Sequence, residues 1–386
     1  MSAKSGALLP VYDHISYPFS LLRAKGSYVF DEAERGYLDL YGGHCVCSIG
    51  HSAPELVAAI SKQAEEFIFY SNLAEIPIRQ RAAKSLLDFG ANYFSKAFFC
   101  NSGAEANENA LKIAIKATGR KRICAFKGAF HGRTLLSMRA TDNEKWHKIY
   151  FEDGNASTLR IRPNEESDLS LIDDSIAAVI LEPIQSIGGV TCFERDYLLK
   201  LQERSGEVGA LLIFDEVQTG IGRTGDPFVS GFNGFAPDMM TLAKGLAGGM
   251  PIGAVALTSE VARTVEAGDV AATFGGAPVV MAALIATIDY MRKNRVLENV
   301  ADIENYIRDR LSTPETSGVL GVLGRGLLLG LLLGTEAKVA RQALFERGII
   351  VGLCSNPKVL HLLPPLNVSR GEIDEFLNAL RGVLGS

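Results

Sequence analysis

Apolar and polar positions change their period repeatedly along the middle of the chain. Between about residue 85 and residue 258, short apolar runs alternate with segments of helical hydrophobic period. The runs predict strands at Ala97–Cys100, Arg122–Phe126, Ile176–Leu181, Ala210–Phe214, Met239–Leu242 and Gly253–Leu257. Several are apolar throughout, which is typical of strands that helices cover on both faces. The alternation predicts an α/β fold with a mostly parallel central sheet.

The C-terminal third has a different pattern. A helical segment at residues 278–294 precedes apolar runs at 324–333, 348–353 and 359–363 and an amphipathic helix at 370–384. This order predicts a smaller α+β domain in residues 276–386, beside a large domain in residues 51–275. Residues 1–50 are expected to contribute to the small domain and to the mouth of a pocket. The most apolar window, Gly326–Gly334, is shorter than the roughly 20 residues that cross a bilayer, so it predicts a buried strand.

Composition excludes some classes of function. The net charge of −5 argues against a nucleic-acid partner, because such proteins present a basic face. Residues 1–14 lack the charged leader and apolar core of an export signal, so a cytoplasmic protein without a membrane partner is expected. The six cysteines are scattered, which favours reduced core residues over disulfides, and the chain lacks the paired ligands of a zinc site. We therefore expect no metal centre.

Polar residues gather directly after the predicted strands. In chain order these positions read NSGAE, KGAFHGR, EPIQ, DEVQTG and AKG. Ligands of open α/β sheets bind beyond the carboxyl ends of the strands. The site is therefore expected at this edge of the sheet.

One of these segments predicts an anion site. Ser102 and Glu105 have the spacing of a capping box, which begins a helix and leaves the N–H groups of Gly103 and Ala104 free to bind a phosphate. An ordinary capped helix explains the same pattern.

Two further positions carry charge next to apolar strands. Asp215 follows a buried strand, where a carboxylate needs a partner such as a protonated ring nitrogen, although a helix cap is an alternative. Lys244 lies among small and apolar residues, which lower the pKa of a lysine and make the amine nucleophilic, although its stem could also carry the amine to solvent. An anion site, a buried carboxylate and a nucleophilic amine together suit pyridoxal 5'-phosphate.

The motifs in their order resemble those of a known family. SGAEANE, FHGRT, LEPIQ, FDEVQTGIGRTG, AKGLAGGMPIGA and TFGG are similar to the class III pyridoxal-phosphate-dependent aminotransferases, and especially to the N-acetylornithine and N-succinylornithine aminotransferases. The similarity runs from YLDLYGGH to LLPPLNVS. It implies the fold type I architecture of aspartate aminotransferase, with residues 51–275 binding the cofactor.

The resemblance also implies roles for individual residues. Lys244 would bind the cofactor as a Schiff base and act as the acid and base, and Asp215 would hold the pyridine nitrogen. Thr273 would contact the phosphate bound by the other subunit of a homodimer. The remaining residues expected at the cofactor are Ser102, Gly103, Ala104, Phe130, His131, Glu182, Val217 and Gln218.

The resemblance is weaker at the substrate positions. Arg133 is similar to the family residue that binds the distal carboxylate of ω-amino substrates, and His44 either lines the pocket mouth or packs in a turn. Ile187 and His361 stand where many relatives have a glutamate and an arginine that handle the α-carboxylate of glutamate. Removing both charges together avoids leaving one of them buried alone. Ala277 replaces a common asparagine at the subunit boundary.

These residues favour transamination of an N-acylornithine with an oxo acid such as 2-oxoglutarate, in arginine biosynthesis. An ω-transaminase acting on 4-aminobutyrate, lysine or another diamine is the alternative within the family. A cofactor-binding protein without turnover is a further alternative, which Lys244, Asp215 and Gln218 disfavour. A nucleotide-binding oxidoreductase using GRGLLLG is disfavoured, because the third glycine of the fingerprint is missing.

Overall fold

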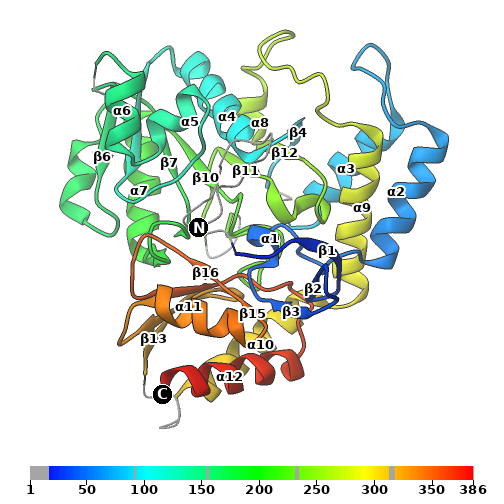
Figure 1. Cartoon of the computed structure of the whole chain (residues 1–386). Coiled ribbons are helices and arrows are strands. Elements are labelled where there is room, and N and C mark those ends of the chain that lie inside the picture. The colour runs from blue at the N-terminus through cyan, green and yellow to red at the C-terminus, as the bar shows by residue number, and fades with distance from the viewer. Residues whose placement is uncertain (1–16, 91–92, 154–155, 231–233, 313–317, 386) are drawn as a thin grey trace.

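A seven-stranded sheet forms the centre of the computed structural model, which describes residues 17–90, 93–153, 156–230, 234–312 and 318–385. The strand order is β4-β12-β11-β10-β7-β5-β6 (Figure 1). Only β12 opposes the other strands, because it pairs antiparallel with both β11 and β4. The bounds are β4 Lys96–Cys100, β5 Arg122–Phe126, β6 Thr158–Ile161, β7 Ile176–Leu181, β10 Leu211–Asp215, β11 Met239–Leu242 and β12 Gly253–Leu257.

The predicted mostly parallel sheet is confirmed, and each predicted strand lies within one residue of its expected bounds. Strand β6 was not predicted from the sequence. This strand has only four residues and includes Arg160, whose guanidinium donates hydrogen bonds to the carbonyl oxygens of Phe126, Arg139 and Ala140. A polar edge strand of that length has no clear apolar period.

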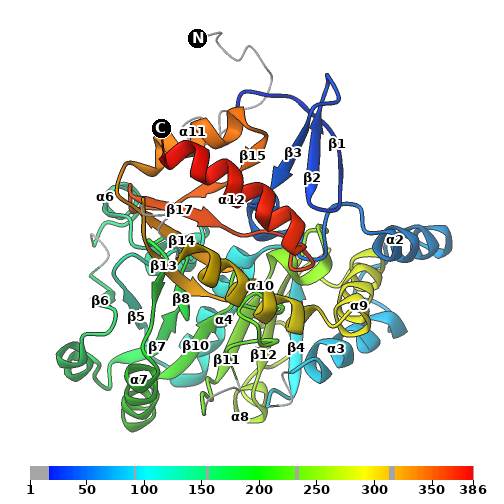
Figure 2. The same cartoon turned by 90° about the horizontal axis from the view of Figure 1, so that it is seen from below.

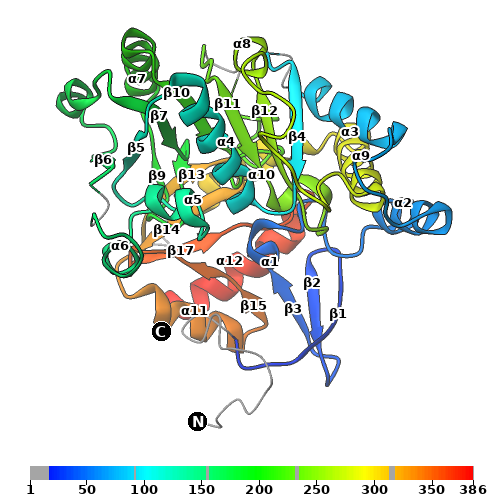
Figure 3. The ribbon, with the colours of Figure 1, turned by 90° about the horizontal axis from the view of Figure 1, so that it is seen from above.

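Helices cover both faces of the sheet. Figure 3 shows α4 (Gly103–Thr118) lying across one face. Ala178 and Ile180 of β7 belong to the core on the α4 side, whereas Val179 and Leu181 belong to the core that contains residues of α7 (Arg195–Val208). Burial on both faces explains why such strands are apolar throughout. The other short helical elements of this region are α5 Leu135–Ala140, α6 Glu144–Tyr150, α8 Ser259–Ala262, η1 Glu166–Leu171 and η2 Lys244–Ala247.

Three helices pack together beyond the β4 edge of the sheet. They are α2 (Pro54–Glu66), α3 (Pro77–Asp88) and α9 (Pro278–Lys293), and α9 also contacts η2. The predicted domain boundary at residues 275 and 276 stays a prediction, because α9 lies beyond it in sequence and packs on helices from before it.

The C-terminal part forms a second, antiparallel sheet with the order β13-β14-β17-β16. The first strands of the described chain join a third sheet, in which β3 pairs in parallel with β15, so that β2 and β3 lie beside α12 (Figure 2). Elements of these regions are β1 Leu21–Lys25, β2 Tyr28–Asp31, β3 Gly36–Asp39, α1 Gly42–Cys45, α10 Val296–Leu311, β13 Val319–Arg325, β14 Leu328–Leu333, α11 Ala337–Glu346, β15 Ile349–Ile350, β16 Gly352–Leu353, β17 Val359–Leu362 and α12 Arg370–Leu384. A small hairpin of β8 (Ile184–Gln185) and β9 (Thr191–Cys192) follows β7.

The apolar window at residues 326–334 forms β14, whose residues are almost all buried, so the predicted buried strand is confirmed. Gly324 lies in β13, paired with Leu329, and Gly326 lies in the turn between β13 and the antiparallel β14. Neither glycine lies between a strand and a helix, which removes the nucleotide-fingerprint interpretation. No helix within the described residues is long and apolar enough to cross a membrane. Residues 1–14, where the sequence lacks the pattern of an export signal, lie outside the described residues.

Candidate active site

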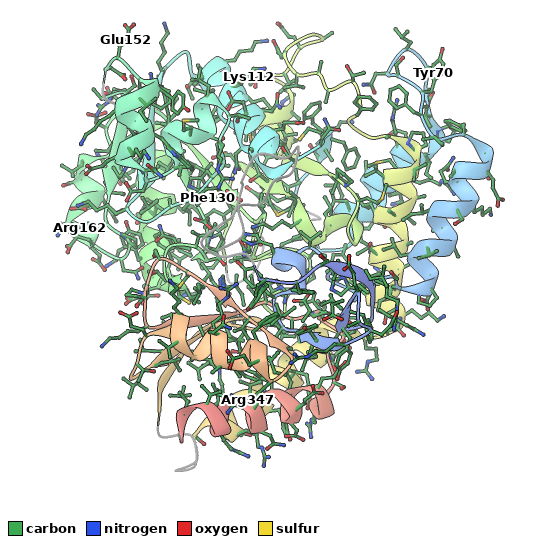
Figure 4. All side chains as sticks on the ribbon, viewed as in Figure 1. Tyr70, Lys112, Phe130, Glu152, Arg162 and Arg347 are labelled. Atoms are coloured by element: carbon green, nitrogen blue, oxygen red, sulfur yellow. The ribbon has the colours of Figure 1, made fainter. Side chains whose placement is uncertain are left out.

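A cavity of about 370 Å³ opens at the carboxyl ends of the parallel strands. The segments after β4, β5, β7, β10 and β11 all contribute to its wall, as the sequence predicted for the polar segments. Figure 4 shows Phe130, which lines it, toward the middle of the molecule, with Glu152 and Tyr70 at the periphery. The predicted site residues in this wall are Ser102, Gly103, Ala104, Phe130, His131, Arg133, Glu182, Asp215, Val217, Gln218 and Lys244.

The N-terminus of α4 forms one end of the cavity. Ser102 Oγ accepts the N–H of Glu105 at 3.2 Å, whereas the Glu105 carboxylate accepts the N–H of Asn101 at 2.8 Å. The predicted capping box is therefore present with its second bond displaced by one residue. The N–H groups of Gly103 and Ala104, the first two of the helix, have no acceptor within it.

Val217 lies so close to Gly103 that no side chain would fit at position 103. A Cβ atom at position 103 would lie 2.8 Å from Val217 Cγ1, closer than real Cβ contacts. The close approach brings the helix N-terminus and the end of β10 to the same cavity.

Asp215 ends β10 as a buried carboxylate with three donors. Its Oδ2 accepts Nδ1–H of His131 at 2.7 Å and Nδ2–H of Asn107 at 2.6 Å, and its Oδ1 accepts the N–H of Val217 at 3.0 Å. The side chains of His131 and Asp215 are 0% and 4% exposed. Asn107 is itself held by Thr241, whose hydroxyl donates to Asn107 Oδ1 at 2.6 Å. This network fixes the carboxylate and compensates its burial.

Lys244 follows β11 with a left-handed backbone, at φ +45°. Its Nζ donates a short hydrogen bond to Gln218 Oε1. Burial lowers the pKa of the Lys244 ammonium, against the opposing influence of the Cys45 thiol and of Asp215. Burial therefore explains the lowered lysine pKa that the sequence predicts. The left-handed backbone of Lys244 is a strained conformation, and such conformations are frequent at functional sites.

The side of the cavity after β5 and β7 carries the remaining charged residues. Burial raises the pKa of Glu182 to about 7, although nearby His131 lowers it, and the Glu182 carboxyl accepts the N–H of Phe130 at 2.9 Å. Arg133 is exposed, and its guanidinium carbon lies 5.2 Å from the centre of the Phe130 ring and 5.5 Å from that of Trp146. The Arg133 guanidinium at the rim of the cavity is therefore within cation–π distance of two aromatic rings.

Three predicted residues lie outside the wall of this cavity. His44 lines a neighbouring cavity, and burial, with Lys244 and Arg133 nearby, lowers its pKa to about 4. His361 is buried in β17 with Nε2 3.0 Å from Ser186 Oγ, and burial, with His44 and Lys244 nearby, lowers its pKa to about 3. Both imidazoles are therefore neutral at pH 7. Thr273 is exposed.

Several residues that line the cavity were not predicted from the sequence. Asn107 lies four positions after Gly103, so the two share one face of α4, and this spacing could have identified it. Val46 comes from the segment after α1, far from the strand ends in sequence, whereas residues 250–252 lie within the motif AKGLAGGMPIGA, between η2 and β12. Val46 is apolar, and no local pattern connects it with the strand ends.

The polar groups of the cavity match the phosphate and the ring nitrogen of pyridoxal phosphate. Two free amide groups at a helix N-terminus suit a phosphate, and the buried Asp215 suits a ring cation. Gln218 Nε2 is a buried donor without a partner in the described residues, next to the amine of Lys244. An oxygen-bearing ligand between these groups would satisfy it.

Comparisons with known proteins agree with this geometry. The family model of aminotransferase class-III matches residues 11–384. The acetylornithine aminotransferase of Archaeoglobus fulgidus is 38% identical over 358 residues, which cover 93% of each protein. That of Caldanaerobacter subterraneus is 39% identical over 379 residues, which cover 95% of each.

Solved structures show the same similarity. N-acetylornithine aminotransferase from Stenotrophomonas maltophilia K279a has a TM-score of 0.81 at 32% identity, with 96% of both chains covered. An ornithine aminotransferase structure from Toxoplasma gondii, described as holding pyridoxal phosphate at partial occupancy, has a TM-score of 0.87 at 25% identity, with 96% of this chain and 90% of that chain covered. The predicted fold type I architecture is confirmed. With one family model spanning nearly its whole length, this chain belongs to the class III aminotransferases, and its cofactor is pyridoxal phosphate.

Proposed function

We propose that this aminotransferase moves the ω-amino group of an N-acylornithine, acetyl or succinyl, to an oxo acid such as 2-oxoglutarate, in arginine biosynthesis in the cytoplasm. The observation that carries the proposal is the placement of Lys244 and Asp215 in one cavity with Arg133 at its rim. Relatives named acetylornithine aminotransferase align over nearly their full length and support this choice of donor.

Each polar residue of the cavity has a separate role in the proposed reaction. Pyridoxal phosphate, when bound, supplies an electrophilic aldehyde and an electron sink. Lys244 offers an amine whose lowered pKa keeps part of it neutral, so Nζ can attack a carbonyl and later accept and return a proton. Gln218 orients that amine through its hydrogen bond. Asp215 would hold a ring cation, and Gly103 and Ala104 would hold the phosphate.

Arg133 would select the donor. Its guanidinium is exposed at the rim, where the carboxylate of an ω-amino acid could reach it while the amine reaches Lys244. A planar guanidinium binds a carboxylate with two parallel hydrogen bonds, which fixes orientation as well as charge.

One feature favours the second candidate, an ω-transaminase on 4-aminobutyrate, lysine or another diamine with a different acceptor. His361 is buried and neutral, and its Nδ1 has no partner in the described residues, so it does not supply the cation of an arginine. Ile187 contributes no carboxylate, and its carbonyl oxygen accepts the N–H of Ser355 at 2.8 Å. Lys358 is exposed and directly precedes β17.

A panel of donors and acceptors with products identified by mass tests the proposal. Acylornithines are expected to yield a semialdehyde. If they give none while 4-aminobutyrate does, the second candidate replaces the first. His361→Arg, with Lys358→Arg as the exposed control on the same strand region, locates the acceptor carboxylate. A rise in kcat/KM for 2-oxoglutarate in the first variant alone places the α-carboxylate near position 361.

A homodimer is part of the proposal. The loop after α2 and the segment around Thr273 carry exposed apolar side chains, and the rings of Phe69 and Phe274 lie 5.0 Å apart. Asn72 and Arg79 bind the carbonyl oxygens of Ala272 and Gly276, which joins the two segments. The exposed apolar residues are Phe67, Ile68, Phe69, Tyr70, Leu73 and Phe274. A patch of this kind is typical of an interface, and Thr273 within it would reach the phosphate of the partner.

Hybrid dimers test the role of Thr273. The Thr273→Ala homodimer should bind pyridoxal phosphate roughly tenfold to a hundredfold more weakly, the value of a hydrogen bond to a charged group. Mixing it with Lys244→Ala at limiting cofactor should create one native site per hybrid dimer and restore activity that neither variant shows. Activity equal to the sum of the separate variants would mean that Thr273 serves its own subunit or none.

A further inference from the structure

The turn that follows β3 has a left-handed backbone. The four residues of α1 are Gly42, Gly43, His44 and Cys45, and their φ values are +54°, +58°, +70° and +65°. The turn is closed by the N–H of Cys45, which donates to the carbonyl oxygen of Tyr41 at 2.9 Å. Glycine adopts this conformation freely, but it is strained for residues that carry a Cβ atom, such as His44 and Cys45. Such a turn persists only where the surrounding structure holds it.

The carboxylate of Asp39 binds the beginning of this turn. Asp39 ends β3, and its Oδ1 accepts the N–H groups of Tyr41 and Gly42 at 3.0 and 2.9 Å. Its Oδ2 accepts the N–H of Gly43 at 3.1 Å and Nε2–H of His51 at 2.9 Å. The side chains of Asp39 and His51 are 5% and 13% exposed. Four donors on one buried carboxylate fix its orientation and that of the turn.

His51 compensates the charge of this buried carboxylate. Burial lowers the pKa of His51, but the hydrogen bond to Asp39 opposes this effect, and the pKa is raised to about 10. The imidazole is therefore charged at pH 7 and forms an ion pair with Asp39.

The residues after the turn contact the segment that carries Lys244. Val46 lines the wall of the candidate active site. Ser48 is buried, and its hydroxyl donates to the carbonyl oxygen of Gly245 at 2.8 Å. A Cβ atom on Gly245 would lie 3.0 Å from Ser48 Cβ, so the two segments approach closely. Because Gly245 directly follows Lys244, the position of the lysine depends on this contact.

The turn also contacts the hydrogen-bond partner of the lysine. Cys45 Sγ lies 3.8 Å from the carbonyl oxygen of Gln218, whose side chain accepts Nζ–H of Lys244. Asp39 lines the neighbouring cavity and not the candidate active site. Any effect of Asp39 on the reaction therefore passes through the turn.

We propose that Asp39, paired with His51, is a positioning residue for the transamination, which holds the left-handed turn and through it places Lys244. The proposal rests on the role proposed for Lys244 but not on the choice of donor. The steps in which Nζ attacks a carbonyl or moves a proton depend steeply on its position. A displaced turn should therefore slow these steps and weaken the binding of the cofactor to the lysine.

Asp39→Asn tests the proposal, because an amide offers one acceptor oxygen in place of two and brings a donor among donors. Asp31→Asn is the matched control. Asp31 ends β2, and its carboxylate accepts the N–H groups of Ala33 and Arg35 at 3.0 Å. It therefore also caps a turn after a strand, but these residues do not line the candidate active site.

Cofactor affinity is measured without turnover. Pyridoxal phosphate is titrated into the cofactor-free protein, and the fluorescence of Trp146, the only tryptophan of the chain, reports binding. The dissociation constant should rise roughly tenfold in Asp39→Asn and stay within about twofold in Asp31→Asn. With any donor that is turned over, kcat should fall roughly tenfold to a hundredfold in Asp39→Asn, whereas KM for the donor should change less than about threefold. Circular dichroism measures the folded fraction, so a loss of folded protein is distinguished from this split.

Two variants of His44 test whether Asp39 holds a strained turn. Glycine at position 44 relieves the strain and alanine keeps it, although both remove the imidazole. The effect of Asp39→Asn on cofactor affinity should be roughly fivefold smaller in the His44→Gly background than in the His44→Ala background. Equal effects in the two backgrounds would show that Asp39 does not act by holding the turn.

Ser48→Ala decides the question if Asp39→Asn does not fold. This variant removes the bond to Gly245 and leaves the Asp39 carboxylate in place, and it should bind the cofactor roughly fivefold more weakly. Wild-type cofactor affinity and kcat in a folded Asp39→Asn, or in Ser48→Ala, would overturn the proposal. An enzyme without activity on acylornithines would contradict the proposed donor only, because the affinity comparison needs no donor.

Discussion

His131 is expected to stabilise the protein chiefly through the charge of Asp215. Removing one donor from a buried carboxylate costs about 1.5 to 3 kcal/mol, the value of a hydrogen bond to a charged group. His131→Ala also removes the packing of the ring and leaves Asp215 with the donors of Asn107 and Val217, so we expect the upper value, about 3 kcal/mol. With an asparagine already at position 215, the same change removes only a neutral hydrogen bond and ring packing, and should cost about 1.5 kcal/mol.

Urea unfolding of the cofactor-free protein at pH 7, followed by circular dichroism, measures these free energies for the wild type, His131→Ala, Asp215→Asn and the double variant. The coupling free energy should be about 1.5 kcal/mol. His147→Ala is the matched control, because this buried imidazole bonds to the carbonyl oxygens of Met138 and Thr141 at 3.2 and 2.8 Å and not to Asp215. Its cost should be the same in both backgrounds. If His131→Ala also costs the same in both, within about 0.5 kcal/mol, the charge of Asp215 is not what His131 compensates.

Three further predictions follow from the cavity. The pKa of Glu182 is raised from 4.5 to about 7, so its stabilising effect is full below pH 4.5 and is lost as the pH rises through 7. Glu182→Gln should remove roughly 3 kcal/mol of pH dependence from the free energy of unfolding, measured by urea titrations between pH 4.5 and 8. Gly103→Ala should weaken cofactor binding through its clash with Val217, and adding Val217→Ala should relieve part of the loss in a fluorescence titration; a loss unchanged by the second variant would contradict that contact. Arg133→Lys should raise KM for an acidic ω-amine donor roughly tenfold and leave KM for a donor without a carboxylate unchanged, as steady-state kinetics can check.

The sequence predicted the central sheet well because burial on both faces leaves strands such as Ile176–Leu181 wholly apolar. Two features of the fold required tertiary information. The antiparallel direction of β12 depends on its pairing with β11 and β4, and its apolar residues are compatible with either direction. The pairing of β3 with β15 joins segments that are more than 300 residues apart, and neither segment indicates the other.

The residues of the candidate site were predictable where a reactive side chain stands at the end of a strand or directly after it. Strand ends carry three of these residues, Lys244, Asp215 and Glu182. Because ligands of open α/β sheets bind beyond the carboxyl ends of the strands, the sequence predicts that the three lie in one site. His131 was found through its motif, but its bond to Asp215 crosses 84 residues and could not be read locally. The surroundings of His361 and His44 depend on how the sheet that contains β17 and the residues after β3 approach the cavity, which explains why their placement outside its wall was not anticipated.

The central claim is that Lys244 binds pyridoxal phosphate covalently. The most direct measurement is borohydride reduction of the protein saturated with the cofactor, followed by mass analysis of its peptides. We expect one reduced pyridoxyl adduct on the peptide that contains Lys244, and none at that position in Lys244→Ala. An unmodified Lys244 in the saturated wild-type protein, or an adduct of equal yield on another lysine, would contradict it.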